Sequence, residues 1–463
     1  MAAKVLDAPM DVMNWPKLLC ADRLGASRSG SYDPSRSAYT IDSDRIIFSS
    51  AFRRLQDKTQ VFPLSDNDYV HTRLTHSLEV ASVGRSLGIR VGAELKKRYA
   101  TELVDFHESD FGAIVYAAAL AHDLGNPPFG HSGEDTIRDW FKNSPVAKFY
   151  REKLTDAETA DFENFEGNAQ GFRIVTRLQM PDNPGLKLTC ATLAAFTKYP
   201  RESILPLGEK PKGISAKKFG FYQSEKDNFT TVAEKTGLLR RTPNTACWCR
   251  HPLAYLVEAA DDICYGLIDY EDGFRLGHLT YEQVSESFLR VTGDPKDRER
   301  AAKMKEKKNS IAFLRAQAIG AAIQQTTDAF LQNEEGMRNG TFDEELLGHL
   351  KSGQELKQIK KHSIETIYST QAGVMIEVAG YEILQSLLDD FAGAVDDIAC
   401  NGRSDANPRS RKLIQLIPGQ FLGDERQPDT DAYTRLLKIT DFVSGMTDTY
   451  ATNLSRRIKM PGR

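Results

Sequence analysis

Four side chains from three separate segments could bind one divalent cation. They are His76 in RLTHSLEV, the adjacent pair His122 and Asp123, and Asp261 in EAADDICY. Two imidazoles and two carboxylates, with no thiolate, suit a borderline-to-hard cation such as Mn, Fe, Co, Ni or Mg better than a structural Zn. Adjacent helical residues point about 100° apart, so His122 and Asp123 can share one ion only where their helix distorts or ends. The GNPP sequence that starts at Gly125 ends that helix immediately.

A second pair of residues could perform acid–base chemistry. His131 follows His122 by nine residues, and Glu134 lies three residues further on. Positions three apart share a helix face, so we expect the Glu134 carboxylate to orient the His131 imidazole and raise its basicity. A histidine supported in this way beside a metal site is suited to be a general acid.

A third group lies on the segment that follows Pro252. Asp261, Tyr265 and Asp269 recur at four-residue steps and fall along one side of a helix. A metal ligand, an aromatic ring and an acceptor in a row could hold a metal-bound phosphate, a sugar ring and a sugar hydroxyl. Taken alone, such a stripe is more often a solvated helix face.

Helical periodicity supplies the elements that must position these groups. Apolar residues recur at three- and four-residue steps over 74–95, and 111–122 is nearly all apolar. The ranges 131–141 and 167–178 are predicted as shorter helices, and Pro252 suits the first position of another that ends near Gly273. The remaining amphipathic patterns occupy 279–337, 342–366, 371–400, 407–417 and 429–458. Period-2 strand patterns are scarce, so the predicted fold class is all-α.

The chain divides into three predicted parts. Residues 1–40 form an irregular N-terminal arm, 41–300 the catalytic core, and 301–463 a C-terminal helical region without a catalytic signature of its own. Within the core, a basic stretch near 198–250 lacks a sustained period and is predicted to be irregular. It could be a solvated loop, a phosphate-binding lid or a groove for single-stranded nucleic acid. Its aromatic residues suit either base stacking or burial on the core: Phe219, Phe221, Tyr222 and Phe229.

Composition narrows the class of protein. The chain has 463 residues, of which 40% are hydrophobic and 27% charged, as is typical of a soluble globular protein with a large core. Its 60 Lys and Arg against 64 Asp and Glu give a net charge of −4, which excludes a generally basic nucleic-acid coat. No membrane span is predicted, because the longest apolar run, 111–121, is far shorter than the roughly 20 residues required. The absence of a signal-peptide layout and the use of only six cysteines predict a reducing, cytoplasmic location.

Two other groups of residues are expected to be structural. Cys247, Cys249 and His251 suggest zinc, but one residue separates the cysteines and no second pair follows, so ordinary packing is the prediction. Five histidines show no partner pattern and are expected at the surface: His71, His107, His278, His349 and His362.

The motifs together resemble the HD-domain deoxyguanosine triphosphate triphosphohydrolases, the bacterial dGTPase family. RLTHSLEV, HDLGNPPFGHSGE, FEGNAQGFR and EAADDICY occur in the family's order, and the likeness extends from FRRLQDKTQVFPL to the SGMTD stretch at 444–448. The resemblance implies an all-α HD-domain helical bundle with additional C-terminal helices that complete the pocket and make subunit contacts. It also implies hydrolysis of a deoxynucleoside triphosphate, with dGTP as the first choice, at the α-phosphorus to deoxynucleoside and inorganic triphosphate.

Residue roles follow from the same resemblance. It makes four residues the metal ligands: His76, His122, Asp123 and Asp261. It makes His131 and Glu134 the catalytic pair. The substrate-binding set that it implies is Gln60 and Asp269 for the 3′-hydroxyl, Tyr265 against the deoxyribose, and Arg73, Lys198 and Lys218 for phosphate. Asn126 stands where many relatives have histidine and resembles the enterobacterial subgroup, so the role of that histidine is in doubt here.

The resemblance and the motifs also predict the partners of the protein and leave two alternative functions to weigh. The resemblance implies a homo-oligomer, hexameric in several relatives, and leaves single-stranded DNA open as a second partner. One alternative is an HD phosphohydrolase that acts on a monophosphate or a cyclic dinucleotide; the Tyr265–Asp269 row and the basic stretch argue against it. Another is a nucleotide-sensing or single-strand-binding protein, but a pure binder has no need of the general acid His131.

Overall fold

Helices are the only extended secondary structure in the described part of the chain, which otherwise consists of turns, irregular segments and isolated bridges. The computed structural model describes residues 11–25, 36–60, 71–180, 185–205, 212–368 and 371–459. Within these ranges it contains twenty α-helices, and its only β-type pairings are four isolated bridges. The predicted all-α fold class is therefore confirmed. None of the described helices combines the length and the hydropathy that crossing a bilayer requires.

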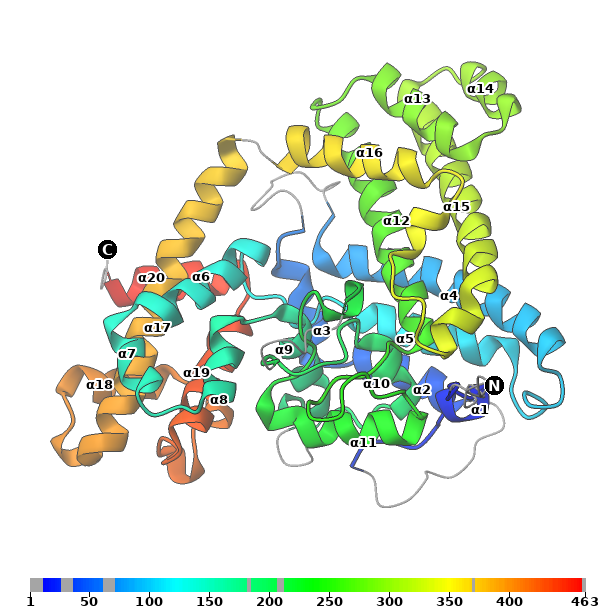
Figure 1. Ribbon diagram of the computed structural model, residues 1–463. Helices are drawn as coiled ribbons and strands as arrows, with labels where there is room; N and C mark the ends of the chain where they lie inside the picture. The colour runs from blue at the N-terminus through cyan, green and yellow to red at the C-terminus, as the bar shows by residue number, and fades with distance from the viewer. Residues whose placement is uncertain are drawn as a thin grey trace, which may run out of the picture.

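Three long helices form the centre of the molecule: α4 (Arg73–Arg98), α5 (Glu108–Ala121) and α12 (Pro252–Arg275). Helix α4 begins with a capping box from Thr72, and α12 begins at the predicted Pro252. Helices α4 and α5 pack closely, because a Cβ on Gly88 would lie only 2.6 Å from the backbone oxygen of Phe111. Figure 1 shows the three helices side by side in the middle of the view.

The largest hydrophobic cluster, called here the first core, surrounds these three helices. The helices that contribute to it are α1 (Trp15–Leu18), α2 (Ala38–Ile47), α3 (Ser50–Arg54), α9 (Gly167–Arg173), α10 (Cys190–Phe196), α11 (Lys226–Thr236), α13 (Tyr281–Thr292), α14 (Pro295–Ala302), α15 (Lys307–Arg338) and α16 (Gly353–Ser363). The predicted arm contributes as well, since Trp15 is fully buried and donates from Nε1 to Glu334 at 2.7 Å. Part of the arm is thus fixed on the core.

A separate hydrophobic cluster, the second core, joins helices that lie far apart in the sequence. Its helices are α6 (Gly130–Asn143), α7 (Pro145–Arg151), α8 (Asp156–Glu163), α17 (Gln371–Asp405), α18 (Pro408–Leu413), α19 (Ala432–Ser444) and α20 (Asp448–Lys459). In Figure 1 the teal helices α6–α8 lie beside the orange and red helices α17–α20. Leu124 belongs to the first core and Phe129 to the second. The turn after His122 therefore passes from one core to the other.

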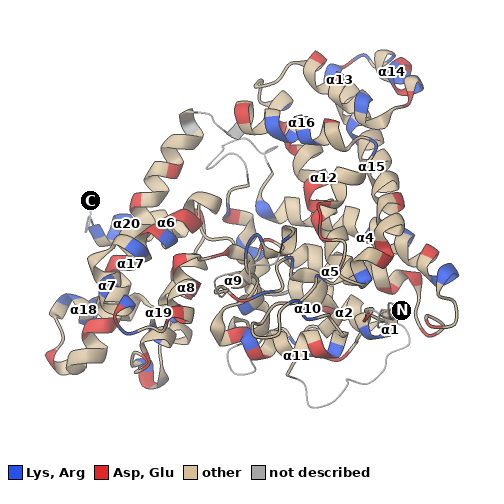
Figure 2. Cartoon of the chain, viewed as in Figure 1, with Lys and Arg blue, Asp and Glu red and all other residues tan. Residues whose placement is uncertain are grey.

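The basic stretch is more ordered than its sequence indicates. Helix α11 lies inside the range predicted to lack regular structure. Phe219, Phe221, Tyr222 and Phe229 are all buried, so of the two expectations for these rings, packing on the core is correct and base stacking is wrong. Figure 2 shows Lys and Arg interspersed with Asp and Glu along the ribbon, and a basic run on α16.

Several residues set aside in the sequence have definite partners. His251 uses both ring nitrogens, one toward the Leu18 carbonyl at 3.0 Å and one accepting from the Leu253 N–H at 3.1 Å, which leaves none for zinc. The expectation that His71 is a surface residue without partners is wrong. Its Nδ1 lies 2.5 Å from Asp272 and its Nε2 lies 3.2 Å from Glu79.

Candidate metal and phosphate site

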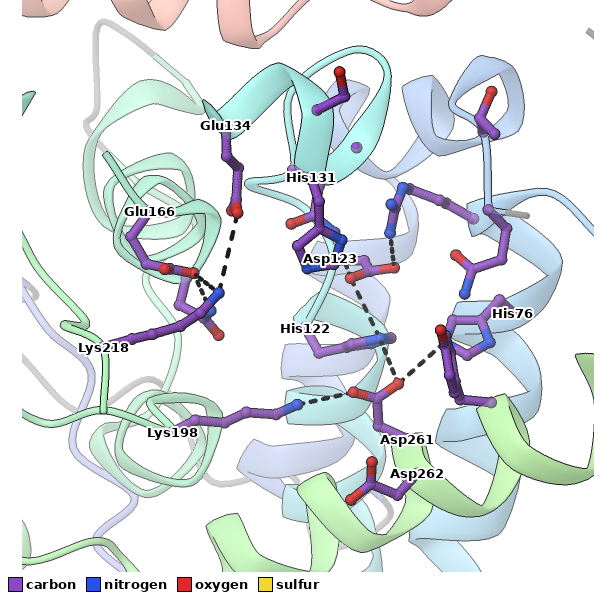
Figure 3. A pocket seen from close by; sticks show the side chains of 18 of the residues that line it. His76, His122, Asp123, His131, Glu134, Glu166, Lys198, Lys218, Asp261 and Asp262 are labelled. Carbon is purple, nitrogen blue, oxygen red and sulfur yellow. Dashed lines mark hydrogen bonds and ion pairs between the residues drawn. The ribbon is translucent and has the colours of Figure 1, made fainter. Parts of the chain in front are cut away.

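The predicted site residues meet in one cavity at the junction of the two cores. The cavity has a volume of about 460 Å³ and is lined from α4, α6, α12, α16 and α17, together with the residues that follow α5 and other connecting segments. Every predicted site residue except Asp269 lines it; Asp269 is 1% exposed and lies outside the lining. Figure 3 shows the labelled side chains pointing into this space.

One half of the cavity, called here the metal half, brings the four predicted ligands together. His76, His122 and Asp123 each offer a ligand atom within 4.8 Å of the others. The Oδ1 atom of Asp261 lies 3.2 Å from His76 Nε2 and 3.5 Å from His122 Nε2. Because His122 is the C-cap of α5, its neighbour Asp123 already leaves the helix and can turn toward the same point. Because the helix ends here, His122 and Asp123 can point toward the same ion although they are adjacent in the sequence.

The donor set fits a divalent cation. His122 Nδ1 lies 2.7 Å from the Ala119 carbonyl oxygen, so the ring donates from Nδ1 and directs Nε2 toward the two carboxylates. That Nε2 atom is buried and has no hydrogen-bond partner among the described residues. Against the effect of burial, the charges of Asp123 and Asp261, each with Oδ1 3.5 Å from Nε2, raise the pKa of His122. A divalent cation would take the place of the proton that this pair of carboxylates favours on Nε2.

Both carboxylates of the metal half are held in the ionised form. Burial opposes ionisation of Asp123, but the charges of His122 and Arg73 hold its pKa below the usual range; Arg73 Nη1 lies 2.6 Å from its Oδ2. Burial likewise opposes ionisation of Asp261, whose pKa is held well below its usual range by Lys198 and His122. Lys198 Nζ lies 2.8 Å from Asp261 Oδ2.

The other half of the cavity, the acid half, carries His131 and Glu134 at the start of α6. His131 is exposed at the cavity mouth, and its partly enclosed position and the charges of Arg73 and Lys218 lower its pKa. Glu134 is buried, and its Oε1 accepts the Gly167 N–H at 2.7 Å. Burial and the neighbouring Glu166 raise the pKa of Glu134 to about 7.

The expected orientation of His131 by Glu134 is not present in this structure. Among the described residues, Glu134 pairs with the Gly167 N–H and with Arg138, whose Nη2 lies 3.3 Å from Oε2, rather than with the His131 ring. Gly167 has no room for a side chain, because a Cβ there would lie 2.8 Å from Glu134 Oε1 and 2.5 Å from Asn126 Oδ1. The role of His131 and Glu134 as a catalytic pair stays a prediction.

Comparison with known proteins agrees with this site. Residues 73–181, which span three of the four ligands and the acid half, match the HD domain. A protein of Synechocystis sp. named deoxyguanosinetriphosphate triphosphohydrolase-like is 43% identical over 96% of this chain and 99% of its own. A like-named protein of Pseudomonas aeruginosa is 41% identical over 97% and 99%, and a deoxyguanosinetriphosphate triphosphohydrolase of Yersinia pseudotuberculosis is 31% identical over 94% and 96%.

The chain belongs to the deoxyguanosine triphosphate triphosphohydrolase family. It is therefore an HD-domain hydrolase, and the recognition made from its motifs is confirmed. The family membership covers nearly the whole chain, so the helices of both cores belong to the family's common structure.

The residues expected to bind substrate in this family member surround the ligands. Lys218 Nζ lies 3.0 Å from Glu166 Oε1 on the acid side, whereas Lys198 contacts the ligand Asp261. Asn126 donates from Nδ2 to Asp123 Oδ1 at 2.6 Å. It therefore orients a ligand of the proposed metal in this structure.

The structure also shows residues in the cavity wall that spacing did not single out. Lys360 lines the cavity, with Nζ 3.1 Å from Asp262 and 5.7 Å from the centre of the Tyr265 ring. Glu166 lies within the motif FEGNAQGFR, which is the signal that could have identified it. The sequence offers no signal for Lys360, because it is one of several basic residues on α16 and its position facing the cavity depends on how α16 packs.

Proposed function

We propose that this protein is a metal-dependent deoxynucleoside triphosphate triphosphohydrolase. It cleaves its substrate, with dGTP as the first choice, at the α-phosphorus to give deoxynucleoside and inorganic triphosphate. The observation that carries the proposal is the convergence of His76, His122, Asp123 and Asp261 on one point, with His122 Nε2 buried and 3.5 Å from an oxygen of each aspartate. The names of the relatives that this chain resembles support the choice of substrate.

The four ligands would hold one divalent cation, for which Mn, Mg, Fe, Co and Ni are the candidates. When bound, such a cation polarises a phosphoryl oxygen and lowers the pKa of water. Because Asp123 and Asp261 stay ionised, the site presents two negative charges to the cation across the physiological pH range. Arg73 and Lys198 touch these carboxylates and lie where they can also neutralise the phosphates.

His131 supplies the proton in this mechanism. Cleavage at the α-phosphorus with loss of O5′ produces a primary alkoxide, a poor leaving group that needs a proton. His131 donates it, and general acid catalysis is worth roughly 10²–10⁴-fold in rate. The charges of Arg73 and Lys218 lower the pKa of His131 in the free protein. A bound triphosphate offsets those charges, so substrate binding favours the protonated, acidic form of His131.

Tyr265 selects deoxyribose. It lines the cavity one helical turn beyond Asp261, so a sugar attached to a metal-bound phosphate lies against its ring. A 2′-hydroxyl pressed against the ring would cost roughly 1–3 kcal/mol, the usual cost of overpacking. Gln60 lines the cavity and is assigned to the 3′-hydroxyl on the family resemblance. The same assignment for Asp269 requires a change in the cavity wall on binding, because Asp269 is buried outside the lining. The variant Tyr265→Ala should gain activity on GTP relative to dGTP, and an unchanged ratio would contradict this role.

Product analysis tests the reaction directly. The purified protein with Mn²⁺ is given dGTP, dATP, dCTP, dTTP and GTP separately, and the products are separated by ion exchange. Deoxynucleoside plus intact inorganic triphosphate supports the proposal. Deoxynucleoside diphosphate plus orthophosphate would mean cleavage at the γ-phosphorus and overturns it. In ¹⁸O-labelled water, attack at phosphorus places the label in triphosphate, and attack at the sugar carbon places it in the deoxynucleoside. His122→Ala from the same purification controls for contaminating phosphatases.

Three further expectations come from the sequence and the family resemblance, and no contact in the described residues bears on them. They are a homo-oligomeric assembly, hexameric in several relatives, single-stranded DNA as a second partner, and a cytoplasmic location. Light scattering tests the first and fractionation of the source cells the third. Titration with single-stranded DNA at several salt concentrations tests the second, because phosphate contacts make such binding fall steeply with salt.

A further inference from the structure

The corner between α19 and α20 contacts two segments that reach the cavity. Asp448, the first residue of α20, is 2% exposed and does not line the cavity. Its Oδ1 accepts the Phe129 N–H at 3.0 Å. Its Oδ2 accepts the Thr59 N–H at 3.0 Å and the Thr59 hydroxyl at 2.5 Å. One carboxylate therefore joins the residue before Gln60 to the turn that leads into His131.

The turn at Phe129 needs such support. Phe129 has φ of +62°, a left-handed conformation that costs a residue with a side chain roughly 1–2 kcal/mol. Its ring packs against α17, where a Cβ on Gly380 would lie 2.6 Å from the ring. The backbone is thus fixed by the ring on one side and by Asp448 on the other. Because His131 follows two residues later, its place at the cavity mouth depends on this turn.

The Thr59 side of the contact leads to the metal half. Thr59 forms an antiparallel bridge with Thr72, the residue that caps α4 immediately before Arg73. Lys58 provides a second tie between the same three segments, because its Nζ donates to the carbonyls of Asn126 and Ser444. The corner of α19 and α20 thereby fixes the distance between the two halves of the cavity.

We propose that Asp448 is a positioning residue for the proposed hydrolysis. Its carboxylate sets the His131 turn and the Gln60 segment against the metal ligands without touching substrate. The C-terminal helices α19 and α20 therefore control the chemical step through this contact. The proposal rests on the proposed function, in which His131 is the general acid.

The variant Asp448→Asn separates positioning from folding. A carboxylate accepts hydrogen bonds on both oxygens, whereas an amide has one accepting oxygen and one donating NH₂ group. Either Phe129 or Thr59 must then face a second donor and move away. We expect kcat to fall roughly 10- to 100-fold, the effect of displacing a catalytic group by about 1 Å. The affinity for Mn²⁺, measured by calorimetry, should stay unchanged because the four ligands are intact.

A buried carboxylate elsewhere in the second core gives the matched control. Asp161 is 0% exposed and accepts hydrogen bonds from Ser203 Oγ, Tyr433 OH and the Gln223 N–H, away from the cavity lining. Asp161→Asn should lower the melting temperature and leave kcat per folded molecule unchanged. If Asp448→Asn also lowers only the melting temperature, Asp448 is merely structural and the proposal is wrong.

A readout without turnover keeps this proposal separate from the proposed function. The ring signals of His131 in an NMR spectrum are assigned by their loss in His131→Gln. Asp448→Asn should shift these signals, and unshifted signals would overturn the positioning role even if the wild-type protein hydrolyses no nucleotide. If Asp448→Asn does not fold, Thr59→Val removes one donor from the same carboxylate. It should lower kcat by a smaller factor, and a wild-type kcat would count against the proposal.

Discussion

The metal half of the cavity is built from the ends and faces of three packed helices, whereas the acid half is built from a turn and the first residues of α6. In the metal half each carboxylate is paired with a cation, and His122 is fixed by its own helix. In the acid half His131 is exposed, and Glu134 accepts a hydrogen bond from the Gly167 N–H and forms an ion pair with Arg138. The metal half is complete within the first core, and the acid half depends on the second.

This difference assigns separate tasks to the two cores. Close packing of α4 and α5 fixes the ligand positions before any substrate is bound, as a cation requires. The acid half is held by residues more than three hundred positions away, such as Asp448. Changes in the first core should therefore act on metal affinity, and changes in the second on the rate of the chemical step.

Removing a ligand should produce the largest effect. His122→Ala deletes the Nε2 ligand atom and should weaken Mn²⁺ binding by more than about 100-fold. Mutating residues that only support metal ligands already lowers metal affinity roughly 10–100-fold. Turnover should disappear with the metal. Calorimetry and the product assay measure the two losses. Asp262→Asn, the neighbour of a ligand on α12, should keep its Mn²⁺ affinity; a parallel loss there would show that the assigned ligand set is wrong.

Removing the acid should leave the metal half intact. His131→Gln should lower kcat by about 10²–10⁴-fold, the usual worth of a general acid, with unchanged Mn²⁺ affinity. The comparison of kcat with the calorimetric affinity checks both points. A variant that loses the metal together with its activity would contradict the division of the cavity into two independent halves.

The fold and the metal half could be predicted from the sequence for one reason. Helical periodicity gives the register of side chains, and a ligand at a helix end, such as His122, needs no knowledge of distant contacts. The partner of Glu134 could not be predicted, because it depends on how the start of α9 docks beside α6. Helix α11 was missed since its polar residues hide the period, and Asp448 offered no signal of where its carboxylate points.

Two of the lysines that line the cavity, Lys218 and Lys198, should have different consequences when they are removed. Lys218 lies in the acid half. The pKa of His131 is lowered mainly by partial burial, then by the charge of Arg73 and then by the charge of Lys218. An acid must be protonated to act, so activity falls as the pH rises through its pKa. Lys218→Ala raises that pKa and should move the alkaline limb of the kcat profile to higher pH. A limb that stays in place would mean that another group is the acid.

Lys198 should instead affect the metal. Its ammonium group lies 2.8 Å from Asp261 Oδ2 and opposes a second cation at the same carboxylate. Lys198→Ala should therefore bind Mn²⁺ more tightly at pH 8, while its KM for the triphosphate rises because a phosphate contact is lost. Calorimetry without nucleotide separates these effects. Lys218→Ala is the matched control with unchanged Mn²⁺ affinity, and weaker binding in Lys198→Ala would contradict the argument.

The smallest effect on activity should come from a contact between α4 and α12 outside the cavity, which acts on stability instead. His71 contacts Asp272 on α12 and Glu79 on α4. Burial opposes protonation of His71, but these two carboxylates raise its pKa from 6.5 to about 10. A group whose pKa is raised on folding stabilises the protein fully below its unfolded pKa, and this contribution is lost as the pH rises through the folded value. The free energy of unfolding should thus fall between pH 6.5 and about 10.

His71→Gln should flatten this part of the pH dependence. Urea unfolding of both proteins at pH 6 and at pH 10 measures the difference, which should be larger for the wild type. The change should leave kcat at neutral pH close to the wild-type value, because His71 does not line the cavity. If kcat fell as sharply as in Asp448→Asn, the contact between α4 and α12 would also govern the acid half. The two halves would then be mechanically coupled through the first core as well as through the corner of α19 and α20.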